Sequence, residues 1–222
     1  MALHYISTRG EAPAAAFEDV LLAGLAPDGG LYVPDAWPAL DTAALRGRDY
    51  AATAARVLAP FTAGTFDAAT LETMAGEVYA RFRHPATTPL VQVGPDRWLM
   101  ELFHGPTLAF KDCAMQLLGR MFEAVLARRG ERVTVIGATS GDTGAAAVGA
   151  LAGLDAVDVA ILHPRGRISE VQRRQMTTCS AANITNIAIE GTFDDCQALV
   201  KAMFADRPFN DAMRLAGTNS IN

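Results

Sequence analysis

The sequence predicts an α/β protein, in which a three-layer domain with a parallel sheet follows a small, mostly helical amino-terminal domain. Two observations support this fold class. From about residue 86 onward, short β-branched runs alternate with stretches of helical periodicity, a pattern typical of βαβ units. The run VTVIGA, residues 133–138, is continuous and rich in β-branched residues, as in strands buried on both faces of a parallel sheet.

The first domain is predicted to span residues 1–85, where apolar residues recur mainly at helical spacing. Its predicted elements are a helix at 13–23, a turn at 27–30, a strand at 31–34, and helical regions capped by Asp41 and Asp67. The segment HPATTP, residues 84–89, breaks the helical pattern, so the second domain is predicted to span residues 86–222.

The second domain is predicted to alternate between strands and helices. In chain order these are strands at 90–93 and 97–101, a helix after Lys111, a strand at 133–138, a helix at 144–153, a strand at 157–164, a helix at 169–176, a strand at 183–191 and a helix at 193–206.

Composition limits the function classes that we consider. The 222 residues carry a formal net charge of −5, which argues against nucleic acid as the main partner. The apolar stretches are short and interrupted, so no membrane span is predicted. The first ten residues contain no apolar signal core, and the three widely spaced cysteines suggest neither a disulfide framework nor a zinc site. A cytoplasmic location is therefore expected, and no metal.

Lys111 lies in an apolar stretch, next to Phe110 and close to Leu108 and Cys113. Most lysines keep the amine in water, and one that stays out of water must be paired, neutralised or used chemically. Burial favours the neutral amine, which is the nucleophile that attacks an aldehyde. The alternative is a surface lysine in the first turn of a helix.

The segment TSGDTG, residues 139–144, follows the strand VTVIGA and precedes a helix. Ligands of open α/β sheets bind at the carboxyl ends of strands, and the first N–H groups of a helix suit a carboxylate or phosphate. Ser140 and Thr143 add hydroxyl donors, and Gly141 allows close approach to the backbone. The segment matches neither the dinucleotide fingerprint nor the Walker loop, and an ordinary helix cap is the alternative.

The segment HPRGRISEVQRRQ, residues 163–175, contains a predicted capping box formed by Ser169 and Gln172. Arg165 and Arg167 precede the helix and could each bind a phosphate bidentately. Arg173 and Arg174 are better interpreted as part of a solvated helix face, on which Glu170 and Arg174 form an i,i+4 pair.

Taken together, these segments resemble the threonine synthase family of pyridoxal-phosphate enzymes, which have the tryptophan-synthase-β fold. The motifs that carry the resemblance are YISTRG (5–10), LLAGLAPDGGLYVP (21–34), TTPL (87–90), ELFHGPTLAFKD (101–112), GATSGDTG (137–144), GRISEVQRRQM (166–176) and IEGTFDDCQALVK (189–201). Their order matches the family from Tyr5 to Asn222.

The resemblance implies conversion of O-phospho-L-homoserine and water to L-threonine and phosphate. It implies that Lys111 holds pyridoxal 5'-phosphate as a Schiff base, with Phe110 beside the ring and Asp142 toward its phenolic oxygen. The residues that it implies for the substrate carboxylate are Thr139, Ser140, Gly141 and Thr143. We add the hypothesis that Arg165 or Arg167 binds the substrate phosphate.

The chain departs from the family at its carboxyl end. Family members are roughly twice as long, and they carry a second glycine-rich loop for the cofactor phosphate and a polar partner for the pyridine nitrogen, neither of which is found here. We therefore expect a truncated chain with weak cofactor binding and little activity, and with exposed sheet edges that favour self-association. The alternatives are a phospho-lyase that releases a keto acid and a non-catalytic module that binds an anion or a partner.

Overall fold

The computed structural model describes residues 2–218, and the chain divides into two compact units that meet between Phe110 and Lys111. The first unit thus extends beyond residue 85, and the domain boundary predicted there stays a prediction. Each unit has its own buried core, and each is described separately below.

The first unit begins with a small antiparallel sheet. Strand β1 (Tyr5–Ser7) pairs with β2 (Tyr32–Pro34), and helix α1 (Phe17–Ala23) lies between them in the chain. The side chain of Tyr5 is buried, and its hydroxyl donates a hydrogen bond of 2.6 Å to the carbonyl of Phe61. The sequence predicted α1 and β2 but not β1, whose three residues carry no periodic signal of their own.

Two helices form most of the core of the first unit. Asp49 caps helix α2 (Tyr50–Leu58) and Asp67 caps helix α3 (Ala68–Tyr79) by accepting backbone hydrogen bonds in the first turn of each. The cap predicted at Asp67 is confirmed. Asp41 instead caps the short 3-10 helix η1 (Thr42–Leu45), which the sequence did not separate from α2. The residues of α3 that pack in the core are Leu71, Met74, Ala75, Val78 and Tyr79.

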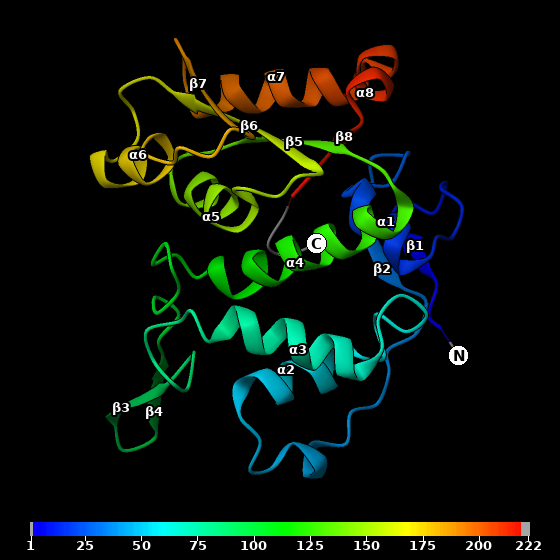
Figure 1. Ribbon diagram of the computed structural model, residues 1–222, viewed down its shortest axis with the longest axis vertical. Helices are drawn as coiled ribbons and strands as arrows, with labels where there is room; N and C mark the ends of the chain where they lie inside the picture. The colour runs from blue at the N-terminus through cyan, green and yellow to red at the C-terminus, as the bar shows by residue number, and fades with distance from the viewer. Residues whose placement is uncertain (1, 219–222) are drawn as a thin grey trace. The chain divides into compact units, whose positions relative to one another are not determined.

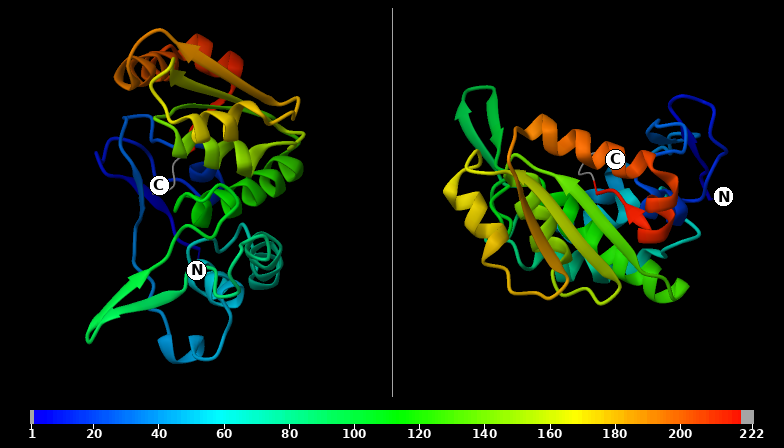
Figure 2. Two further views of the ribbon diagram at one scale, coloured as in Figure 1. Left: turned by 90° about the vertical axis from the view of Figure 1, so that its left-hand side faces the viewer. Right: turned by 90° about the horizontal axis from the view of Figure 1, so that it is seen from above.

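Strands β3 (Leu90–Gly94) and β4 (Arg97–Met100) form an antiparallel hairpin in the first unit. The hairpin extends away from helices α2 and α3 of the same unit (Figure 2). Its apolar side chains are exposed on both faces, Trp98 and Val93 among them. Both strands were predicted from the sequence.

The second unit contains a four-stranded parallel sheet with the order β7-β6-β5-β8. Its strands are β5 (Val133–Ala138), β6 (Val157–Pro164), β7 (Ile184–Ile189) and β8 (Leu215–Ala216). The first three were predicted from periodicity, and β8 was not. Its two residues pair with Thr134 and Val135 of β5, so β5 has neighbours on both sides.

Helices cover both faces of this sheet, which confirms the predicted three-layer α/β class. Helix α7 (Phe193–Ala205) lies on one face, and α5 (Asp142–Leu151) lies on the other (Figure 1). The remaining helices of the unit are α4 (Asp112–Arg129), α6 (Glu170–Thr177) and α8 (Arg207–Met213). Helix α4 packs on α5, and α5 on α6.

The register of β5 and β6 positions two of the predicted motifs side by side. Ala138 pairs with Leu162 at the carboxyl end of the two strands, and Thr139 N–H continues the ladder with a hydrogen bond of 2.9 Å to the carbonyl of Leu162. The TSGDTG and HPRGR segments therefore leave the sheet at the same edge, where open α/β sheets bind ligands.

Over residues 2–218, the structure contains no helix that combines the length and apolar character needed to cross a membrane.

Candidate functional site

The hydroxyl of Thr139 organises the turn between β5 and α5. The side chain is buried, and its oxygen accepts hydrogen bonds of 2.9 Å from Gly141 N–H and 2.8 Å from Gly144 N–H. These two N–H groups are thus satisfied within the turn and are not available as donors to a ligand. Thr139 lies inside the turn, where its geometry suits a positioning role.

Two glycines of the turn are required by geometry. Gly141 has a φ of 142°, which only glycine adopts without strain. A Cβ atom added to Gly144 would lie 2.5 Å from the sulfur of Met176 and 2.6 Å from Cγ2 of Thr139. The absence of side chains at these positions lets α6 and the end of β5 pack closely against the turn.

Lys111 and Asp142 form an ion pair at the start of α4 and α5. Nζ of Lys111 lies 2.6 Å from Oδ2 of Asp142, and the two side chains are 15% and 37% exposed, respectively. The structure therefore places the amine largely out of water and in contact with the SGDTG segment. The role of Lys111 in holding a cofactor stays a prediction.

The pKa of the Asp142 carboxyl lies below its ordinary value. Partial burial opposes ionisation, but the hydrogen bond from Lys111, the charge of its amine and a hydrogen bond of 2.9 Å from Thr143 N–H together outweigh that cost. Asp142 is thus an ionised carboxylate that is fixed from two directions.

Replacing Asp142 by asparagine should remove part of the pH dependence of stability. Because the folded pKa is lowered, the ionised carboxylate stabilises the fold above its ordinary pKa of 3.8, and this contribution is lost as the pH falls through the lowered folded value. Thermal unfolding between about pH 6 and about pH 2 should show that the destabilisation caused by Asp142→Asn shrinks toward acid pH. The same substitution at the more exposed Asp158 is the control. A constant difference across this range would contradict the expectation.

The hydroxyls of Ser140 and Thr143 differ from that of Thr139. Neither makes a hydrogen bond to any residue between 2 and 218, and Ser140 is exposed. Both therefore retain free donors at the amino terminus of α5, where the helix dipole favours an anion. The prediction that they bind a substrate carboxylate is compatible with this arrangement and stays a prediction.

The segment before Lys111 belongs to the first unit. Phe110 is its last residue and is 49% exposed, and its predicted place beside the cofactor ring stays a prediction. Leu108 has a φ of 66°, in the left-handed region that a branched side chain rarely occupies. Such backbone strain persists only where the surroundings impose it, and it is concentrated at functional sites.

Arg165 and Arg167 both lie in the exposed loop between β6 and α6, but their surroundings differ. The guanidinium of Arg165 is paired with the carboxylate of Glu190. Arg167 has no such pair within the described part of the chain. Its charge makes a small contribution to the lowered pKa of Asp195, which is due mainly to hydrogen bonds from Thr192. Arg167 is therefore the better of the two candidates for binding an anion.

Helix α6 confirms one sequence prediction and corrects another. Glu170 pairs with Arg174, as predicted, and also with Arg173. The hydrogen bonds from both arginines lower the pKa of Glu170 to about 2. The capping box predicted for Ser169 and Gln172 is only half formed: Ser169 Oγ accepts from Gln172 N–H, but the Gln172 carboxamide lies against Gly141 instead of capping Ser169 N–H.

Two residues near the turn were not singled out as site residues from the sequence. One is Gln172, which was assigned only to a capping box. The other is His163, which is buried at the carboxyl end of β6, with no hydrogen-bond partner for its Nδ1 atom among residues 2–218. Since side chains alternate along a strand, His163 projects to the same face as Ile161, which packs beside Gly144. The sequence signal that could have identified His163 is its position near the end of the buried strand VDVAILHP.

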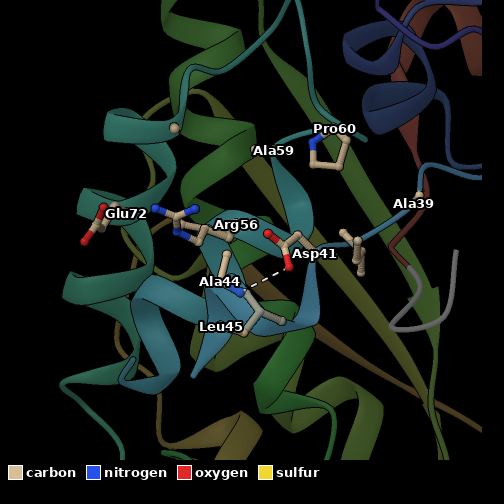
Figure 3. Close-up of a pocket in the computed structure, with 11 residues that line it drawn as sticks. Ala39, Asp41, Ala44, Leu45, Arg56, Ala59, Pro60 and Glu72 are labelled. Atoms are coloured by element: carbon tan, nitrogen blue, oxygen red, sulfur yellow. Dashed lines mark hydrogen bonds between the residues drawn. The ribbon is translucent and has the colours of Figure 1, made fainter. Parts of the chain in front are cut away.

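A pocket of about 400 Å³ lies in the first unit, between η1, α2 and α3 (Figure 3). Asp41 lies at its edge, where its carboxylate accepts a hydrogen bond from Ala44 N–H. None of the residues that line the pocket is a predicted site residue.

Comparison with known proteins identifies the class of protein. Residues 82–221 match the family described as pyridoxal-phosphate dependent enzyme, and residues 4–79 match the threonine synthase N terminus. The chain therefore belongs to the pyridoxal-phosphate dependent enzymes, whose cofactor is pyridoxal phosphate.

Within this class, the chain is similar to the amino-terminal portion of threonine synthases, as the motifs predicted. It is 56% identical to the threonine synthase of Pseudomonas aeruginosa, over 99% of this chain and 48% of that protein. Pyridoxal-phosphate-bound threonine synthase from Brucella melitensis superposes with a TM-score of 0.92 and 56% identity, over 100% of this chain and 48% of that one. For yeast threonine synthase the TM-score is 0.88 and the identity 40%, over 99% and 46% of the respective chains.

The chain thus spans about half the length of these relatives. Its residues fit pyridoxal phosphate on chemical grounds. A largely buried primary amine can react with the aldehyde, an ionised carboxylate lies beside that amine, and a helix amino terminus with free hydroxyls lies in the same turn.

Proposed function

We propose that this chain corresponds to the amino-terminal half of a threonine synthase, which converts O-phospho-L-homoserine and water to L-threonine and phosphate. The observation that carries the proposal is the contact of 2.6 Å between the Lys111 amine and Asp142 of the SGDTG turn. It occurs in a chain that is 56% identical to threonine synthase across the matched half of that enzyme.

Lys111 is proposed to hold the cofactor and to move protons. When bound, pyridoxal phosphate supplies an electron sink next to the substrate carbons that lose and gain protons. The Lys111 amine, once free, can take a proton from one substrate carbon and return it to another, as a general base and then a general acid. Asp142 keeps Nζ in place between these steps, and the partial burial of both side chains limits access of water.

The SGDTG turn is proposed to bind the substrate carboxylate. Ser140 and Thr143 supply hydroxyl donors at the amino terminus of α5, while Thr139 and Gly141 shape the turn. Arg167 is proposed to bind the substrate phosphate, because Arg165 is already paired with Glu190.

Three further properties are part of the proposal. With half the length of its relatives, the chain is expected to bind pyridoxal phosphate weakly and to turn over little substrate alone. Strand β7 and most of the outer side of β5 are open sheet edges within the described residues, which favours self-association. The net charge of −5 and the small-molecule chemistry fit a cytoplasmic enzyme that does not bind nucleic acid.

The test is to join this chain to the part of the Pseudomonas aeruginosa enzyme that follows the matched region, and to identify the products formed from O-phospho-L-homoserine. The fusion should release L-threonine and phosphate, and the 222-residue chain alone should release little of either. The change Arg167→Ala in the fusion should weaken substrate affinity by about tenfold or more, whereas Arg174→Ala should not.

Other outcomes would redirect the assignment. Release of phosphate with a keto acid and no threonine would indicate a phospho-lyase. A folded fusion that neither binds pyridoxal phosphate nor forms product would indicate a non-catalytic module and would contradict the proposed function.

A further inference from the structure

The carboxamide of Gln172 lies directly against the SGDTG turn. A Cβ atom built on Gly141 would lie 2.1 Å from Oε1 of Gln172 and 2.5 Å from its Cδ. Helix α6, which carries Gln172, packs on α5, which begins at Asp142. Gln172, from the segment HPRGRISEVQRRQ, thus packs against the TSGDTG turn, although 31 positions separate it from Gly141 in the chain.

Ser169 fixes the orientation of this carboxamide. The Ser169 hydroxyl oxygen accepts a hydrogen bond of 3.3 Å from Gln172 N–H, so its own hydrogen is free to donate. The hydroxyl oxygen of Ser169 lies 2.9 Å from Oε1 of Gln172. Because the hydroxyl donates to this atom, the atom is the oxygen of the amide and not its nitrogen. The Nε2 group therefore points away from Ser169, with two N–H donors.

The Nε2 donors of Gln172 join two hydroxyl donors that also lack an acceptor among the described residues. Within residues 2–218, neither Nε2 of Gln172 nor the hydroxyls of Ser140 and Thr143 make a hydrogen bond. The side-chain acceptors in the turn already accept other hydrogen bonds. Thr139 Oγ1 accepts from two backbone N–H groups, and the Asp142 carboxylate accepts from the Lys111 amine and from Thr143 N–H. Each of the three donors is therefore open to an external acceptor, and a carboxylate has enough lone pairs to accept from several donors.

We propose that Nε2 of Gln172 donates a hydrogen bond to the carboxylate of the amino-acid substrate at the SGDTG turn. This assignment rests on the proposed function and adds a substrate-binding residue to it. The donors are two hydroxyls and one neutral amide, which suit a planar carboxylate with one negative charge. A phosphate dianion is better matched by a guanidinium such as that of Arg167.

The test uses the fusion described above, in the presence of pyridoxal phosphate, and compares Gln172→Glu with the unsubstituted chain in that fusion. Glutamate has the same shape, keeps an oxygen for Ser169 and replaces the donor by a second anionic oxygen. Calorimetric titration with L-threonine should show affinity reduced by about tenfold or more, whereas titration with inorganic phosphate should change by less than about twofold. Gln197→Glu, which makes the same charge change on helix α7, should leave both affinities unchanged.

A second variant separates binding from folding. Gln172→Met keeps the length of the side chain against Gly141 but has no donor, and it should lose L-threonine affinity while its thermal unfolding stays close to that of the unsubstituted fusion. The inference is wrong if either variant binds L-threonine normally, if phosphate affinity falls equally, or if the unsubstituted fusion binds no L-threonine. Labelling of Lys111 by pyridoxal phosphate and borohydride in the same samples reports on the proposed function independently.

Discussion

Reduction with borohydride in the presence of pyridoxal phosphate should attach a pyridoxyl group to Lys111 and leave Lys201 largely unlabelled. The chain contains only these two lysines, so Lys201 is an internal control. Lys201 is exposed on α7, whereas Lys111 is mostly buried beside an ionised carboxylate and a helix amino terminus that can orient an anionic aldehyde. We expect labelling at Lys111 to exceed labelling at Lys201 by at least about tenfold, measured by peptide mass spectrometry.

Two controls make this result specific. The change Lys111→Arg keeps a cation that can pair with Asp142 but removes the reactive amine, so the label at position 111 should disappear while the fold is retained. In denaturant, the two lysines of the unsubstituted chain should label to similar extents, because the preference depends on the folded site. Equal labelling of both lysines in the folded chain would contradict the assignment of Lys111 as the cofactor lysine.

Replacing Gly144 by alanine should cause a clear loss of stability, because the SGDTG turn has no room for the added methyl group. The new Cβ would lie 2.5 Å from Sδ of Met176, 2.6 Å from Cγ2 of Thr139 and 3.0 Å from Cγ2 of Ile161. These atoms belong to buried side chains of α6, the turn and β6, so relief requires displacement of packed elements. Overpacking of this kind costs about 1–3 kcal/mol of unfolding free energy.

The matched control is Gly137→Ala, two residues before the turn. Its nearest neighbour would be Cδ1 of Ile161 at 3.9 Å, which is an ordinary contact. Its unfolding free energy should therefore be unchanged, or higher by up to about 1 kcal/mol. Thermal unfolding measures both variants, and each kcal/mol corresponds to a shift in Tm of about 2–4 °C for a chain of this size. Equal Tm values for the two variants would show that the turn adapts to a methyl group at Gly144.

The sequence predicted the elements whose signals are local. The strand VTVIGA, the cap at Asp67 and the pair formed by Glu170 and Arg174 depend on residues within a few positions of one another, and all three are present. Strands β1 and β8 were missed because they consist of three and two residues, too few for a period, and exist only through pairing with distant strands.

In the candidate site, too, local features were predictable from the sequence and contacts between distant segments were not. The motif TSGDTG predicts a ligand-binding turn, with an ordinary helix cap as the alternative, but its sequence does not tell which hydroxyls face inward. In the structure, the hydroxyl oxygen of Thr139 accepts hydrogen bonds from Gly141 N–H and Gly144 N–H. The hydroxyls of Ser140 and Thr143 make no hydrogen bond within the described residues. The contact between Gln172 and Gly141 required the packing of α6 on α5, which no short-range pattern encodes.

The pairing of β8 with β5 has a consequence for the order of events on the ribosome. Translation proceeds at about 5–20 residues per second, so β5 emerges seconds before Leu215 and Ala216 are made. During that interval the strand that leads into the SGDTG turn is an open border of the nascent sheet, with unpaired backbone groups at Thr134 and Val135. Leu215 and Ala216 then pair with two of the six residues of β5, so Thr134 and Val135 can mispair with another strand only until this late segment has been synthesised.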